Sequence, residues 1–411
     1  MLVRARIVLP IRGQPVENAV VAIFKDRVTA VCRWNGNHSD ETIVDLGNSI
    51  LLPGLVNAHC HLDYTDMAGL PPRKQFPDWI KGLLALKAAA SYTDYAAAWL
   101  RGARMLARTG TTTVGDIEAV PELLPDVSSS TPLRIFSFLE LTGVRSKRPA
   151  VEILREASSK IESLSSKGSL AGLSPHALYS TTPALLNQTA RLARRKRWRV
   201  TMHVAESIEE QEMYVQRRGS LFDWLRSQRD MSDCDGGTPV QQVRGCGLLG
   251  ENFLAVHANC LDGDDIAALA ESGSSVVHCP RSHAYFQHPP FLYERLAAAG
   301  VNVCLGTDSM ASVLQVRREK VELNMFAEMR AFAERHPEIE AEEIVRMATH
   351  NSARALGLQD QVGGLFEGGA ADLIAIPFAG KIEDASEAVI HHTGDVTASM
   401  IAGRWIFNPA I

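Results

Sequence analysis

The sequence lacks long apolar runs, blocks of like charge and closely spaced cysteines, and each absence argues against a class of protein. No segment reaches about 18 uninterrupted apolar residues, so we expect no transmembrane helix. Charged residues make up 22% of the 411 residues, the net charge is −5, and neither sign forms a long run, which speaks against binding to nucleic acid or a membrane surface. The seven cysteines are scattered without the spacing of a zinc ribbon, as expected of reduced thiols in a cytoplasmic protein.

The sequence also has no internal repeat and no glycine-rich phosphate loop after its first buried-strand pattern. It has instead a regular alternation of short apolar runs with helical patterns. The eight runs are 51–61, 111–116, 134–141, 170–176, 200–206, 253–260, 274–280 and 301–308, and the helical patterns are 93–108, 150–166, 183–197, 208–226, 262–272 and 290–299, then 314–335 and 340–356. Eight such repeats over roughly 260 residues predict a (β/α)₈ TIM barrel, an α/β fold. A doubly wound open sheet is the alternative, weakened by the missing phosphate loop.

The two ends of the chain differ from this middle. Residues 1–52 are rich in Val and Ile with turn breaks between them, so they predict short antiparallel strands rather than a signal peptide. Residues 363–411 have the same character. We therefore expect a small composite β-sandwich domain formed by 1–52 and 363–411 beside a barrel domain at 53–362, although the terminal strands could equally decorate the barrel. The long segment 229–251 could shape a pocket wall.

Polar residues with metal-binding or acid–base chemistry occur where the predicted strands end. Six of the 13 histidines share this position, together with two acids: His59 and His61, His176, His203 followed by Glu206, His257, His278, and Asp308. In a barrel the carboxyl ends of the strands form one rim, which carries the active site. Any one of these histidines would ordinarily be interpreted as a buried structural residue. That interpretation does not explain why six of them lie at the carboxyl ends of predicted strands. The shared position therefore favours a functional site at this rim over six unrelated structural histidines.

The residue types narrow the chemistry to a metal-dependent hydrolysis. Three imidazoles (His59, His61, His203) and the Asp308 carboxylate can hold one divalent ion and leave a position for water, whose pKa the ion lowers. His59 and His61 are two apart on a strand and so point the same way, whereas Cys60 points away and is expected to pack. Glu206 lies three residues after His203 and suits a proton shuttle. His257 could orient the hydroxide or polarise the bond under attack, and for His278 a structural role is favoured.

Six motifs resemble those of the amidohydrolase superfamily: PGLVNAHCH, SPHALYS, HVAES, VHANCLD, VHCPRSH and LGTDSMAS. They are most similar to the branch of hydrolytic deaminases and chlorohydrolases of aminated N-heterocycles. The resemblance implies one zinc or iron(II) ion held by His59, His61, His203 and Asp308. It also implies Glu206 as the residue that protonates the ring nitrogen, His257 as the catalytic histidine, Asp308 as a catalytic base and His176 as a substrate contact. No lysine ends the fourth strand, which favours one metal ion over two.

The substrate is less constrained than the metal site. HLDYT, SPHALYSTTP and LGTDSMAS look most like aminofutalosine deaminases of the alternative menaquinone pathway, which act on an adenine nucleoside carrying a benzoate. Phe76 and Trp79, expected in the loop after strand one, could stack on a ring. Candidates for the other substrate groups are Arg145, Arg148 and Arg281 for a carboxylate, and Ser282 and His283 for a sugar hydroxyl.

Other readings remain open. If the protein is an enzyme, the alternative substrates are guanine-type bases, triazines or chlorotriazines, adenosine-like thioethers and cyclic amides. From a different class, the chain could be a catalytically inactive scaffold, although such proteins are expected to lose ligands and here every ligand position is present. The expected partner is a small aminated heterocycle, without nucleic acid or membrane, and a homo-oligomer is possible.

Overall fold

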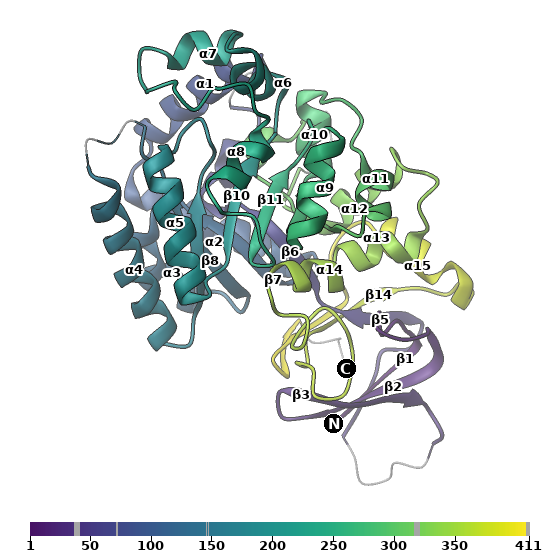
Figure 1. The fold of residues 1–411 in the computed structure, drawn as a ribbon. Coiled ribbons are helices and arrows are strands. Elements are labelled where there is room, and N and C mark those ends of the chain that lie inside the picture. The colour runs from purple at the N-terminus through teal and green to yellow at the C-terminus, as the bar shows by residue number, and fades with distance from the viewer. Residues whose placement is uncertain (37–41, 71–72, 145, 147, 316–320, 408–411) are drawn as a thin grey trace.

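A computed structural model of the chain, described for residues 1–36, 42–70, 73–144, 146, 148–315 and 321–407, contains a barrel of eight parallel strands covered by helices (Figure 1). The strands follow one another around the barrel in chain order: β6 (Leu55–Cys60), β7 (Thr111–Glu118), β8 (Arg134–Leu141), β9 (Leu170–Pro175), β10 (Val200–Val204), β11 (Phe253–His257), β12 (Ser275–His278) and β13 (Asn302–Leu305). A bridge between Cys60 and Asp308 joins the first strand to the chain just after the last. The predicted (β/α)₈ barrel is confirmed.

A second, mostly antiparallel sheet is built from both ends of the chain, as predicted. Its order is β16-β15-β14-β5-β1-β2-β3, with β4 on β1. The strands are β1 (Leu2–Val8), β2 (Val16–Phe24), β3 (Arg27–Arg33), β4 (Ile43–Asp45), β5 (Ser49–Pro53), β14 (Leu373–Pro377), β15 (Ala398–Ile401) and β16 (Arg404–Phe407). Figure 1 shows this sheet below the barrel, with purple and yellow strands side by side. The exact domain bounds 1–52, 53–362 and 363–411 stay a prediction.

The single strand expected over 51–61 is two strands that belong to different sheets. β5 and β6 are separated only by Gly54, at which the chain leaves the terminal sheet and enters the barrel. A side chain at Gly54 would collide with the Thr112 side chain, so this crossing requires glycine. The apolar run gave no sign of the break because all residues of both strands are buried.

The helices cover the outside of the barrel and its upper rim. They are α1 (Phe76–Ala89), α2 (Tyr92–Arg108), α3 (Leu124–Val127), α4 (Ala150–Ser166), α5 (Pro183–Lys196), α6 (Ile208–Gln211), α7 (Ser220–Leu225), α8 (Pro239–Gly245), α9 (Gly263–Ser272), α10 (Pro280–Phe286), α11 (Tyr293–Ala298), α12 (Met325–Ala333), α13 (Ala341–Met347), α14 (His350–Ala355) and α15 (Ala385–Ile390). Within the described parts of the chain, no helix has the length and apolar character needed to cross a bilayer.

Three predictions about helices were wrong. The helix expected over 208–226 breaks, because Arg217 and Gly219 adopt positive φ values of 54° and 97°. The helix expected over 340–356 divides at Thr349 into α13 and α14. Phe76 and Trp79 lie in α1 instead of a loop, with Pro77 in the first turn, where its missing N–H costs nothing. The helix expected over 314–335 includes 316–320, which lie outside the described residues.

Candidate active site

Four side chains from three distant segments meet above the barrel. His59 and His61 come from β6 and the residue just after it, His203 from β10, and Asp308 from the turn after β13. One ligand atom from each lies within 4.8 Å of every other. The Asp308 Oδ1 atom is 3.6 Å from His59 Nε2 and 3.8 Å from His61 Nε2, while the Nε2 atoms of His61 and His203 are 3.4 Å apart. The structure therefore brings the sequence-derived ligand set together.

The backbone around the β6–β13 seam fixes two of these ligands. The Asn57 carboxamide accepts hydrogen bonds from the N–H groups of His59 and Thr307, and its Nδ2 donates to Thr307 Oγ1 at 2.7 Å. The carbonyl of His59 in turn accepts from the N–H groups of Thr307 and Asp308, at 3.0 and 3.1 Å. Gly306 is required at this seam, since a Cβ there would lie 2.8 Å from the His59 carbonyl oxygen. Asn57 and Gly306 were not identified from the sequence.

Replacing Gly306 by alanine should push β6 and β13 apart and spoil the ligand geometry. The added Cβ would also meet the His59 Cβ at 2.9 Å and its nitrogen at 3.1 Å, and backbone atoms cannot move aside cheaply. We expect unfolding to become easier by about 1–3 kcal/mol, as for overpacked cores, together with weaker metal binding, measured by denaturant titration and metal analysis. Gly245→Ala is the control, because its Cβ would meet nothing within 4 Å. Equal behaviour of the two variants would contradict the role given to Gly306.

The donor atoms fit a divalent ion. His203 donates from Nδ1 to the carbonyl of His176 at 2.8 Å, which leaves the lone pair of its Nε2 facing the cluster. Asp308 accepts from Ser312 on Oδ2 at 2.8 Å, so Oδ1 remains for the ion. Both ring nitrogens of His59 are buried and find no hydrogen-bond partner among the described residues. Buried imidazole nitrogens without partners are costly unless something absent from the protein itself binds them.

Burial sets the charge of these ligands. Desolvation, followed by the neighbouring histidines, holds the pKa of His203 well below its usual range, and burial acts first in the same way on His61. Burial opposes ionisation of Asp308, yet the His59 ring beside its carboxylate and the charges of the other histidines hold its pKa well below the usual range. Neutral imidazoles and an ionised carboxylate are the protonation states that bind a metal ion.

Glu206 and His257 lie beside the four ligands. Glu206 is 5% exposed, and its backbone N–H donates to Glu210 Oε2 at 2.8 Å while its carbonyl accepts from Asn259. Burial, and next the negative charge of Asp308, raise the pKa of the Glu206 carboxyl well above its usual range. His257 Nε2 is 3.6 Å from Glu206 Oε1, too far for a hydrogen bond, and burial lowers the pKa of His257 to about 4. This pair therefore offers a carboxyl group whose protonated form burial favours and an imidazole that is neutral at neutral pH.

The turns that carry this chemistry have unusual backbone geometry. His257 adopts a φ of 73° and Asp308 a φ of 51°, both in the left-handed region, which residues other than glycine rarely occupy. Such conformations cost of the order of 1–3 kcal/mol each and cluster at functional sites. The backbone after these two strands therefore turns the His257 and Asp308 side chains toward the metal-ligand cluster.

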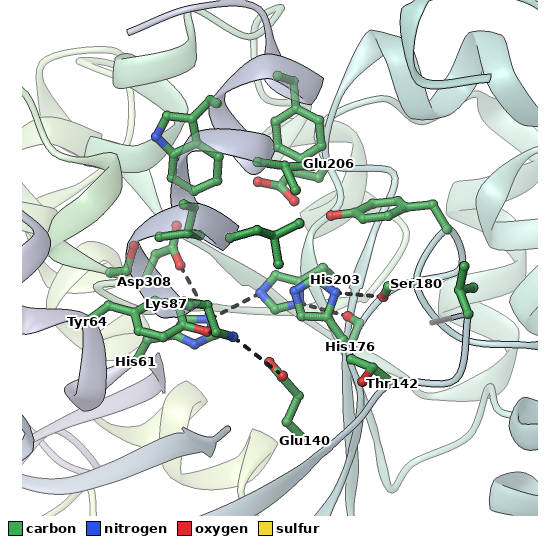
Figure 2. Close-up of a pocket in the computed structure, with 18 of the residues that line it drawn as sticks. His61, Tyr64, Lys87, Glu140, Thr142, His176, Ser180, His203, Glu206 and Asp308 are labelled. Carbon is green, nitrogen blue, oxygen red and sulfur yellow. Dashed lines mark hydrogen bonds and ion pairs between the residues drawn. The ribbon is translucent and has the colours of Figure 1, made fainter. Parts of the chain in front are cut away.

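A pocket opens onto this cluster, and its wall is largely apolar and aromatic (Figure 2). Of the residues expected to contact substrate, Phe76, Trp79 and His176 line it. His176 is fixed by a 2.8 Å hydrogen bond between its Nδ1 and Ser180 Oγ, and Trp79 by its Nε1–H, which donates to the carbonyl of Ala311. Further lining residues are Tyr64, Ile80, Leu83, Leu84, Lys87, Glu140, Thr142, Val144, Tyr179, Trp224, Leu225 and Ser309. None of the described residues in 229–251 lines the pocket, so that segment does not form the expected wall.

The structure places the other expected substrate contacts elsewhere. The Arg281 guanidinium donates to the buried Glu328 carboxylate at 2.5 Å, and Arg148 is exposed and pairs with Glu156. Neither is among the described residues that line the pocket, and each arginine has a carboxylate partner of its own. Ser282 is buried and also does not line the pocket. Arg145 lies outside the described residues.

His278 and His283 also lie away from the pocket lining. The His278 ring stacks on Phe291 with their centres 3.8 Å apart, as suits a structural role. His283 hydrogen-bonds to the Pro289 carbonyl through Nε2 at 2.8 Å. Sequence reasoning missed Lys87 and Glu140, which do line the pocket. Glu140 carried a signal, as an acid near the carboxyl end of the third strand, whereas Lys87 carried none, because α1 was not anticipated.

The amidohydrolase family profile matches residues 50–406, which is most of the chain. The chain belongs to the amidohydrolase family. This amidohydrolase is therefore a hydrolase acting on carbon–nitrogen bonds, and the resemblance inferred from its motifs is confirmed.

Relatives and solved structures agree with this assignment. A 5-methylthioadenosine/S-adenosylhomocysteine deaminase from Thermococcus onnurineus is 30% identical to this amidohydrolase over 372 residues, covering 88% of this chain and 81% of its own. The zinc-bound structure of an adenosine deaminase from Xanthomonas campestris superposes with a TM-score of 0.85 at 24% identity, covering 99% of this chain and 93% of that one. Helicobacter pylori aminofutalosine deaminase has a TM-score of 0.86 at 20% identity, covering 99% and 100%. The two superpositions show a shared fold.

Proposed function

We propose that this amidohydrolase is a metal-dependent hydrolytic deaminase that replaces the exocyclic amine of an adenine-type nucleoside by a keto group and releases ammonia. The observation that carries the proposal is the buried Glu206 carboxyl beside the His59–His61–His203–Asp308 cluster, in one pocket. A metal cluster alone would serve many hydrolyses, whereas a protonated acid next to it suits a substrate with a basic ring nitrogen. The deaminase relatives support the same reaction.

Each residue has a task that follows from its surroundings. When bound, a divalent ion, which we propose to be zinc, supplies a Lewis acid and lowers the pKa of water. Asp308 stays ionised, accepts a proton from the attacking water and returns it to the amine, which leaves as ammonia; the proton of the new hydroxyl group returns to Glu206 as the keto group forms. Glu206, whose protonated form is favoured by burial and by the charge of Asp308, donates its proton to the ring nitrogen next to the carbon under attack. His257, uncharged at neutral pH, hydrogen-bonds to the oxygen that becomes the keto group.

The pocket wall supports a flat, partly apolar substrate. Phe76 and Trp79 stack with ring centres 6.3 Å apart, and Tyr179 approaches Phe76 edge-on at 6.2 Å. Aromatic walls of this kind bind purine rings through their faces and edges. Among adenine nucleosides we propose aminofutalosine as the first candidate, on the motif resemblance and the H. pylori fold neighbour, and 5-methylthioadenosine as the second, on the T. onnurineus relative.

A substrate panel tests the proposed function. Purified, zinc-loaded protein is assayed for ammonia release with adenosine, 5-methylthioadenosine, aminofutalosine, guanine, a triazine and a cyclic amide, before and after chelation. We expect release from the adenine nucleosides, loss of that activity on chelation and its return with zinc, because both ring nitrogens of His59 are buried without a partner among the described residues. Activity on the triazine or the amide alone would overturn the purine assignment, and unchanged turnover without metal would overturn the scheme.

A further inference from the structure

The backbone of Glu206 is held on both sides by two buried side chains that the proposed chemistry does not use. The Glu206 N–H donates to Glu210 Oε2 at 2.8 Å, and the Glu206 carbonyl accepts from Asn259 Nδ2 at 3.0 Å. Glu210 is 0% and Asn259 3% exposed, and neither is among the described residues that line the pocket. Glu210 lies in α6, whereas Asn259 follows β11, two residues after His257. Two segments that are distant in the sequence therefore converge on one residue.

The segment that carries Glu206 belongs to neither of its neighbouring elements. β10 ends two residues before Glu206, and α6 begins two residues after it. Ala205, just before Glu206, adopts a φ of 51° in the left-handed region, which costs free energy in a residue other than glycine. The Ala205 carbonyl accepts from the N–H groups of Asn259 and Cys260, at 2.9 and 3.0 Å. Because strand and helix both stop short of Glu206, the direction of its side chain depends on these contacts and on the two hydrogen bonds to Glu206 itself.

Helix capping does not account for Glu210. In a capping box the acid at the third helical position reaches back to the backbone N–H of the N-cap residue, as Asp94 does to Ser91 at the start of α2. Ser207 is the N-cap residue of α6, and its hydroxyl accepts from the Glu210 N–H at 3.2 Å. The Glu210 carboxyl, however, extends one residue further and accepts from Glu206 instead. Its hydrogen bond therefore serves the residue with the proposed acid role rather than the end of the helix.

Both side chains also carry a buried atom without a partner. Glu210 Oε1 and Asn259 Oδ1 find no hydrogen-bond partner among the residues that the structure describes. Burial raises the pKa of Glu210 to about 8, because its surroundings oppose the charged form. Buried polar atoms without partners destabilise a fold, and an apolar side chain of similar size avoids that cost. Stability alone therefore gives no reason for an acid at position 210.

We propose that Glu210 and Asn259 are positioning residues that orient the Glu206 carboxyl for proton transfer. The Asn259 hydrogen bond also ties the turn after β10 to the turn after β11, and so sets Glu206 Oε1 against His257 Nε2, 3.6 Å away. A displacement of about 1 Å far from the chemistry can lower a rate by about 100-fold, so hydrogen bonds to this backbone can control kcat. This inference rests on the proposed function, because the orientation of Glu206 matters only if Glu206 transfers a proton.

Two substitutions at Glu210 test the positioning role on the zinc-loaded enzyme, with the most active adenine nucleoside of the substrate panel. Glu210→Met removes the acceptor but fills the same buried space, whereas Glu210→Gln keeps a side-chain oxygen for the Glu206 N–H. We expect kcat to fall by about 10- to 100-fold in the methionine variant and to stay within a few-fold of the wild type in the glutamine variant. KM and zinc content should be unchanged, and the unfolding midpoint of Glu210→Met should equal or exceed that of the wild type. A loss of stability in step with the loss of kcat would indicate a merely structural residue and overturn the inference.

A double-mutant cycle with Glu206 gives a readout that a structural role would not move. Adding Glu210→Met to Glu206→Gln should lower kcat by no more than about two-fold, because no acid remains to be oriented. Asn259→Leu removes the donor to the Glu206 carbonyl and should behave in the same way in both backgrounds, so it provides a second probe if Glu210→Met fails to fold. Glu209→Met, at the neighbouring position of α6, is the control and should keep the wild-type kcat.

The outcomes separate this inference from the proposed function. Full kcat in Glu210→Met, or the same loss from Glu210→Met in the Glu206→Gln background as in the wild type, would overturn the positioning role and leave the deaminase assignment standing. An equal loss of kcat in Glu210→Gln and Glu210→Met would do the same, because the glutamine keeps the acceptor. No turnover of any adenine nucleoside by the wild type would overturn the proposed function itself.

Discussion

Glu206→Gln should lower kcat for deamination by about 10²- to 10⁴-fold, the range for loss of a general acid–base group, while the protein keeps its fold and its metal. Glutamine has nearly the same shape, and it can donate a hydrogen bond, but it cannot give up a proton to the ring nitrogen. Glu206 is not one of the four metal ligands, so metal content should be unchanged. The measurement is steady-state kinetics beside metal analysis of the same sample.

The pH profile provides a second check on Glu206. Burial and the Asp308 charge raise the pKa of Glu206, so the active, protonated form persists to higher pH than in a free glutamate and is lost as the pH rises through that pKa. The wild type should therefore lose kcat on the alkaline side, and the glutamine variant should lack that decline. Glu209→Gln, in the neighbouring helix α6, is the matched control and should behave as the wild type. A Glu206→Gln enzyme with near-normal kcat would rule out the acid role.

Asp308→Asn should affect metal binding as well as turnover, which distinguishes it from the Glu206 variant. The amide removes the negative charge that faces His59 Nε2 and His61 Nε2, and it cannot accept a proton from water. Loss of a residue that merely supports a ligand weakens metal binding by about 10- to 100-fold, so loss of a ligand should exceed this range. The expected results are zinc affinity reduced more than 100-fold, by competition with a chelating dye, and a larger fall in kcat than for Glu206→Gln.

Excess zinc separates the two roles of Asp308. If the carboxylate served only to hold the ion, saturating zinc would restore kcat. We expect occupancy to return while kcat stays low, because the proton acceptor is still missing. The control is Asp66→Asn. Asp66 lies in the turn after β6, is exposed and pairs with Arg101, so this substitution should leave zinc affinity and kcat unchanged. Full recovery of kcat at saturating zinc would contradict the second role.

The sequence predicted most of the barrel because its strands and helices are locally encoded. Each strand of the barrel is a short buried run, and helices such as α4 show their amphipathic pattern without help from tertiary contacts. The ligand residues were recognisable for the same reason, since strand ends share one rim whatever the loops do. The terminal sheet could be predicted from its β-rich composition, but the strand division at Gly54 could not, because burial on both sides hides it.

The substrate contacts were less predictable, since they depend on which partner a side chain finds. Arg281 follows a strand directly, as a carboxylate-binding residue would, yet Glu328 from α12 engages it. Lys87 belongs to a helix whose existence depends on packing over the rim. The left-handed φ of His257 is likewise imposed by the surrounding turns. The sequence does not indicate it, because the position is not a glycine. Partner choice of this kind is tertiary information, which periodicity does not contain.

The short crossing between β5 and β6 ties formation of the catalytic rim to the order of protein synthesis. β5 has five paired positions with β14 and two with β1, so its main neighbour leaves the ribosome only after the whole barrel. In a nascent chain that ends before residue 373, β14 is absent. The strand β5, which leads into the ligand-bearing β6, then pairs only with β1. Pairing between such distant segments is slow. The barrel strand made first therefore pairs early with β7 but is joined at its other end to a strand, β5, whose main partner is made near the end of the chain.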